Sequence, residues 1–73
     1  MARSRFMVSP ASVMAFLMRN VDLSRFTLEV TKISPREHHF KIIDKQTQEV
    51  VFSLTWNSSV RDRVTLPLQL LAA

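Results

Sequence analysis

The sequence Glu37-His38-His39 is the one cluster of titratable side chains in the chain. Imidazole and carboxylate groups serve as zinc ligands and as acid–base catalysts. Adjacent residues of a strand point to opposite faces, so these two histidines could not both hold one ion. No third and fourth ligand stands at metal spacing, and the chain has no cysteine. We therefore expect no metal site here, but a solvated histidine pair at the start of a strand.

Other catalytic arrangements are equally unsupported by the sequence. The serines lack a glycine-flanked turn of the kind that presents a nucleophile, and a phosphate cradle needs glycine, of which the chain has none. The carboxylates stand singly along the chain: Asp22, Glu29, Glu37, Asp44, Glu49 and Asp62. We expect a protein that is not an enzyme and that uses no cofactor.

The size and composition predict one small folded domain. The chain has 73 residues, of which 47% are hydrophobic, and without cysteine it cannot form a disulfide. This composition fits a reducing compartment, so we expect a cytoplasmic protein. Residues 1–21 are rich in arginine and serine and carry no acidic residue before Asp22, which is the composition of a mitochondrial presequence and makes that location the alternative. The longest apolar run, Val13 to Met18, is too short to cross a membrane.

The clearest boundary in the sequence is the start of a helix at Ser9 and Pro10. A serine hydroxyl caps a helix well, and the fixed φ of proline suits the first helical position. Asn20 or Asp22 is expected to end the helix. The apolar residues at helical spacing are Val13, Phe16, Leu17 and Val21, with Met14 and Met18 widening the stripe.

After Ser24 the apolar period changes from about 3.6 to 2, which indicates strands. Apolar residues alternate over 26–31, 40–43, 50–56 and 64–70. Pro67 cannot donate to a ladder, so the last strand belongs at a sheet edge. The pattern predicts an α+β fold, in which one N-terminal helix packs on a three- to four-stranded antiparallel meander. The aromatic residues in phase with the buried set are Phe26, Phe40, Phe52 and Trp56, and we expect them in the core.

The polar connection Asp44 to Glu49 has the length of a hairpin loop. Such loops usually place glycine where φ must be positive, and this chain has no glycine. We predict that Gln48 takes this conformation.

The predicted organisation is a flexible basic arm over residues 1–8, one domain over 9–70 and a disordered tail over 71–73. A small core, an edge strand and a net charge of +4 favour a protein-interaction module that binds a larger protein with an acidic surface. The expected contact residues lie at the two ends: Arg3, Arg5, Phe6, Leu66, Leu68, Leu70 and Leu71. An edge strand also offers a route to a homodimer.

Nucleic-acid binding is the alternative function, because the chain is basic. The expected phosphate contacts are Lys41, Lys45, Arg61 and Arg63. Arg3 and Arg5 on the arm would add to them. By analogy alone, small basic proteins without an active site include regulators of larger machines, such as phage or viral proteins that act on host transcription.

Overall fold

The computed structural model describes residues 3–59 and 62–72 of the chain. In chain order the described elements are β1 (Arg3–Phe6), α1 (Pro10–Asn20), β2 (Phe26–Ser34), β3 (Glu37–Asp44), β4 (Val50–Asn57), β5 (Arg63–Leu66) and the short 3-10 helix η1 (Leu68–Leu70). This is an α+β fold with an N-terminal helix and antiparallel strands, as the change of period predicts.

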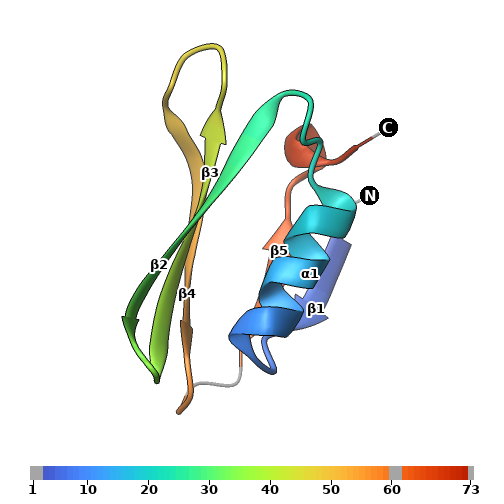
Figure 1. Ribbon diagram of the computed structural model, residues 1–73. Coiled ribbons are helices and arrows are strands. Elements are labelled where there is room, and N and C mark those ends of the chain that lie inside the picture. Colours follow the sequence, from blue (N-terminus) through green and yellow to red (C-terminus); the bar gives the residue numbers. More distant parts are fainter. Residues whose placement is uncertain (1–2, 60–61, 73) are drawn as a thin grey trace.

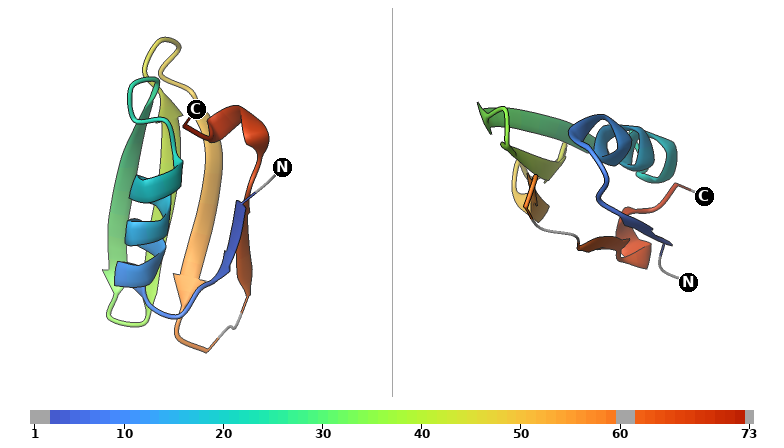
Figure 2. Two further views of the ribbon diagram at one scale, coloured as in Figure 1. Left: turned by 90° about the vertical axis from the view of Figure 1, so that its right-hand side faces the viewer. Right: turned by 90° about the horizontal axis from the view of Figure 1, so that it is seen from below.

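Strands β2, β3 and β4 form a three-stranded antiparallel meander, while β1 and β5 form a separate antiparallel pair. We call this pair the β1–β5 ribbon. Seen from below, the strands curve around a common interior, and α1 lies across the opening between β2 and the ribbon (Figure 2). In the left-hand view of Figure 2, β4 lies next to the ribbon. The meander's outer strand β2 thus lies on the side of the molecule away from the ribbon.

Helix α1 begins where the sequence predicts. The Ser9 hydroxyl accepts from the Ser12 backbone N–H at 3.1 Å, and the Ser12 hydroxyl accepts from the Ser9 N–H at 3.0 Å, so the two residues form a capping box. Pro10 occupies the first turn. At the other end the Asn20 side chain donates to the Phe16 carbonyl at 2.9 Å, and the helix stops there.

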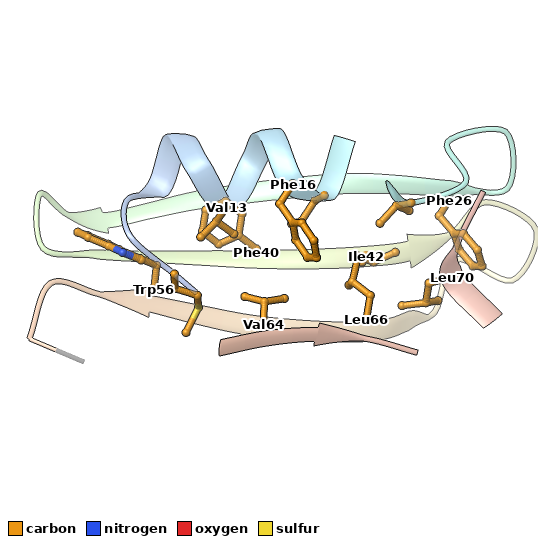
Figure 3. Packing of buried hydrophobic residues seen from close by; sticks show 12 residues of the cluster. Val13, Phe16, Phe26, Phe40, Ile42, Trp56, Val64, Leu66 and Leu70 are labelled. Carbon is orange, nitrogen blue, oxygen red and sulfur yellow. The ribbon is translucent and has the colours of Figure 1, made fainter. Parts of the chain in front are cut away.

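The core lies between α1, the inner face of the meander and the ribbon (Figure 3). Phe26, Phe40 and Trp56 are buried and Phe52 packs against them, which confirms their prediction as core residues. The helix contributes Val13, Phe16 and Leu17 to the same cluster. Burying this apolar surface is the main favourable contribution to folding in a domain without disulfides.

The prediction of a flexible arm over residues 1–8 is wrong for its described part. Residues Arg3–Phe6 form β1, which pairs antiparallel with β5 from Arg3↔Leu66 to Phe6↔Arg63. The buried Met7 follows, and its N–H donates to the Asp62 carbonyl at 2.9 Å. Pairing with β1 supplies hydrogen-bond partners for the backbone groups along one edge of β5.

The C-terminal segment also differs from its prediction. Strand β5 ends at Leu66, because Pro67 follows it, and the chain continues as η1 instead of one strand to residue 70. The expected tail is held in place over its described residues. Leu71 forms a bridge with Val21, and the Ala72 N–H donates to the Asn20 carbonyl at 2.8 Å.

The loop between β3 and β4 contains the predicted positive φ. Gln48 has φ 63°, and within the described residues no other non-glycine residue has a positive value. The Asp44 carboxylate accepts from the backbone N–H groups of Gln46 at 2.7 Å and Thr47 at 3.2 Å, and these bonds shape the loop before Gln48.

Candidate binding groove

The two histidines lie on opposite faces of β3, as strand alternation predicts. The ring of His38 lies edge-on to Trp56 on the inner face, with their centroids 5.7 Å apart, and its Nδ1 is buried without a hydrogen-bond partner. On the outer face, His39 Nε2 lies 2.6 Å from a carboxylate oxygen of Glu37. Over residues 3–59 and 62–72, the structure brings no three metal-ligating side chains together. The cluster therefore divides into two separate contacts.

The predicted contact residues of the N-terminus lie on the ribbon. Arg3, Arg5 and Phe6 are exposed on β1. The guanidinium of Arg63 lies 4.4 Å from the centre of the Phe6 ring, and its Nε lies 3.4 Å from the Ser4 hydroxyl. Strand pairing thus places an aromatic ring and a cation from opposite ends of the chain side by side.

The predicted leucine strip does not exist as a surface. Leu66 and Leu70 are buried in the core and Leu71 is partly buried against it. Only Leu68 of this set is exposed. The turn of η1 after Pro67 moves Leu68 to the outside and brings Leu70 inward, so this segment carries one exposed leucine.

The predicted phosphate contacts do not converge into one patch. Lys41 lies on the outer face of β3 opposite Glu29, and Lys45 lies in the loop that leaves β3. Arg63 begins β5 at the opposite end of the molecule from that loop (Figure 1). Arg61 falls outside the described residues.

The structure shows a different surface, which the sequence analysis did not identify. A groove with a volume of about 380 Å³ runs between α1 and β2. Its lining is mostly apolar and comprises Met14, Met18, Leu23, Phe26, Thr27, Leu28 and Lys45. Met18 is 56% exposed and Leu23 is 40% exposed. We call this surface the α1–β2 groove.

The groove follows an unpaired strand edge. Strand β2 is hydrogen-bonded to β3 on one side, and none of the described strands pairs with its other side. The Lys45 N–H donates to the Arg25 carbonyl at 3.0 Å, so the backbone groups of Arg25 point toward the β3 side. Because these directions alternate along a strand, Thr27, Glu29 and Thr31 face β3, whereas the backbone groups of Leu28 and Val30 face the free edge.

One charged side chain lines the groove. Lys45 Nζ donates to the Leu23 carbonyl at 2.8 Å, which fixes the ammonium at the end where the turn from α1 enters β2. The remaining lining side chains are uncharged. The groove therefore combines an apolar floor, a row of free backbone groups and one cation.

The sequence pattern alone does not reveal this groove. Met14 and Met18 have the helical spacing of core residues, and this spacing does not show that Met18 remains exposed in the folded protein. Alternation predicts a strand over 26–31, but it does not show which side of that strand remains unpaired. A partial signal was present, because β2 contains no proline and has a charged residue only at Glu29 and Lys32.

No family model, no curated protein and no solved structure matches this chain. Among the described residues there is no helix with the length and hydrophobicity needed to span a membrane.

Proposed function

We propose that this protein is a small non-enzymatic interaction module that binds an extended segment of a larger protein in the α1–β2 groove. The segment adds to the free edge of β2 as a further strand. The observation that carries this proposal is the unpaired edge at Leu28 and Val30 beside an apolar groove. Strand addition is a common mode of peptide recognition, in which main-chain bonds give affinity and side-chain pockets give specificity.

The edge of β2 lacks the usual protection against pairing over most of its length. Soluble proteins guard such edges with proline, charged residues or bulges. Here Lys32 and a bulge at Ile33 come only near the end of the strand. The stretch from Phe26 to Thr31 has no proline and one charged residue, Glu29, and its first three residues line the groove. An unguarded edge next to an exposed apolar surface favours an interaction site.

The biological role that fits this site is regulation. A module that holds a segment of its partner in the α1–β2 groove acts by making that segment unavailable to other partners. The net charge of +4 steers such a module toward acidic surfaces. We propose a regulator of a larger protein machine, of the kind that phage or viral proteins use against host transcription, the latter by analogy only.

Val30→Pro tests the site directly. The N–H of Val30 faces the free edge, so proline removes a donor to an added strand and leaves the ladder to β3 intact. In affinity capture from cells that express the protein, the wild type should recover a protein partner that survives nuclease treatment, and Val30→Pro should lose it. Val30→Ala is the matched control, since it trims the same side chain and keeps the N–H. Equal recovery with Val30→Pro and the wild type would contradict the proposal, provided that thermal melts show both to be folded.

Nucleic-acid binding stays as a second candidate because of the ribbon. The exposed Phe6 ring with Arg63 beside it is a surface on which a base can stack, while Arg3 and Arg5 lie on the other face of the ribbon, in register with Leu66 and Val64. In the same capture experiment this function predicts recovery that nuclease abolishes. Arg63→Gln should weaken that recovery, whereas Val30→Pro should leave it unchanged.

A further inference from the structure

The chemistry of the segment that binds the α1–β2 groove follows from Lys45, and this inference rests on the function proposed above. The ammonium of Lys45 has three donors, of which one is used by the Leu23 carbonyl. It is the single charged group in the lining of the groove. Two donors therefore remain for a ligand at the end of an otherwise uncharged surface.

The neighbouring carboxylates are engaged elsewhere. Asp22 forms an ion pair with Arg25 at 3.0 Å and accepts from the Ser24 hydroxyl at 2.6 Å. Asp44 accepts from two backbone N–H groups of its own loop. Within the described residues Lys45 has no ion pair. A cation beside an apolar floor is satisfied best by a carboxylate that arrives with the ligand.

We propose that the bound segment is an extended peptide that carries a carboxylate at Lys45 and an apolar side chain over Met14 and Leu28. The carboxylate is that of an aspartate, a glutamate or a chain end. Methionine side chains adapt their shape, so Met14 and Met18 accept apolar side chains of several sizes. The charge at Lys45 then supplies the specificity that the apolar floor lacks.

A peptide fits this groove better than a fatty acid, although both combine a carboxylate with apolar groups. The backbone groups of Leu28 and Val30 face the free edge, and the structure gives them no hydrogen bond outside the ladder among the described residues. A fatty acid offers them no partner, whereas a peptide backbone offers both donors and acceptors.

A second copy of the chain fits less well than a partner of opposite charge. Each copy has a net charge of +4, so two copies repel each other. The one carboxylate within β2 is Glu29, which projects from the outer face opposite Lys41 and away from the groove. A β2 edge paired with its own copy therefore leaves Lys45 without a counter-charge.

The experiment is a selection of random peptides displayed on phage against the folded full-length protein. One library ends in a free carboxylate and another presents peptides internally. Each selection is repeated with Val30→Pro, Lys45→Gln and Lys45→Glu. Lys41→Gln is the matched control, because it removes the same charge from the outer face of the sheet.

Binders that depend on Val30 should alternate apolar residues and carry one acidic residue at a fixed position, or a free chain end. Synthetic copies of them should bind Lys45→Gln about tenfold more weakly than the wild type and Lys41→Gln equally well. Lys45→Glu should select basic residues at that position. The library that yields the binders shows whether the carboxylate is a side chain or a chain end.

The outcomes separate this inference from the proposed function. Val30-dependent binders without any acidic preference, unaffected by Lys45→Gln, overturn the role of Lys45 and leave strand addition standing. If every binder is indifferent to Val30→Pro, both proposals fail. A protein that sediments as a dimer, and as a monomer after Val30→Pro, overturns the partner peptide in favour of a second copy.

Discussion

The two outer strands β1 and β2 expose their edges in opposite ways. Strand β1 has four residues, two of which are arginines, and pairs only with β5. Strand β2 has nine residues, of which Glu29 and Lys32 are charged, and its bulge at Ile33 comes near its end. A short edge with two arginines in four residues resists the addition of another strand, whereas a long edge with few charged residues accepts it more readily. This difference favours the edge of β2 over the edge of β1 as the place where a further strand could add.

Both regions expose single apolar side chains, and on the ribbon side these include Phe6 and Leu68. Most leucines of the C-terminal segment are buried in the core. On the β2 side, Met18 and Leu23 remain exposed in the lining of the groove, and Val30 is exposed two residues beyond Leu28 of that lining. A leucine-rich segment of a sequence thus does not by itself locate a contact surface, because most of its side chains can be buried in the core.

The largest expected effect tests whether the C-terminal leucines belong to the core. Leu66 is fully buried, so Leu66→Ala should lower the free energy of unfolding by about 3 kcal/mol. Leu68 is 57% exposed, and Leu68→Ala should change it by less than about 0.5 kcal/mol. Urea denaturation of the two variants measures the difference. Similar losses for both would show that the segment after Pro67 packs differently from this structure.

A proline scan along β2 tests the assignment of its two sides. The N–H of Thr31 faces β3, so Thr31→Pro removes a ladder bond and leaves a β3 carbonyl without its donor, which should cost about 2 kcal/mol of stability. The N–H of Val30 faces the free edge, and Val30→Pro should cost about 1 kcal/mol or less. Thermal melts distinguish the two. If Val30→Pro is the more damaging substitution, the free edge of β2 carries the opposite set of residues and the site proposed here is wrong.

Local signals made most of the fold predictable. The capping serine and proline of α1, the alternation of Phe26 with Thr27, and the glycine-free loop at Gln48 each depend on neighbours in the sequence, and the structure agrees with them. The effect of Pro67 is equally local. Its missing N–H predicts an edge strand that continues to residue 70, whereas in the structure β5 ends at Leu66, directly before this proline.

The pairing of distant segments was not predictable in the same way. Residues 3–6 pair with β5 some sixty positions later, and nothing in their own sequence distinguishes a strand from a basic arm. The groove also depends on a distant relation, namely how far α1 lies from the edge of β2. Alternation specifies which face of a strand is buried, but it does not specify which strand lies next to it.

A smaller effect is expected at Gln48, in the loop beyond the groove. Its φ of 63° is unfavourable for a residue with a Cβ and costs nothing for glycine. Gln48→Gly should therefore raise the free energy of unfolding by about 1 kcal/mol, even though the side-chain bond to the Lys45 carbonyl is lost. Glu49→Gly, at the next position, should destabilise instead. A thermal melt that shows Gln48→Gly to be less stable than the wild type would contradict the strain at this position.

The smallest expected effect concerns Asp22, which links the turn from α1 to β2 with the C-terminal segment after β5. Asp22 lies in the turn from α1 to β2, and its N–H donates to the Leu70 carbonyl at 2.8 Å. The Asp22 carboxylate also binds Arg25, whose guanidinium donates to the Gln69 carbonyl at 2.6 Å. The bond from the Ser24 hydroxyl, with further help from the Ser24 N–H and Arg25, holds the pKa of Asp22 below its ordinary value.

A lowered pKa in the folded state fixes the sign of the pH dependence. The stabilisation by Asp22 is fully present above the unfolded pKa of about 3.9, and it is lost as the pH falls through the lower folded value. In an NMR titration, the amide signals of Gln69 and Leu70 should therefore shift below about pH 4 in the wild type, and Asp22→Asn should remove that shift. Asp44→Asn is the control, because it removes a carboxylate from the other loop and should leave those signals titrating. Unchanged titration of Gln69 in Asp22→Asn would mean that the α1–β2 turn and the C-terminal segment are not coupled through this carboxylate.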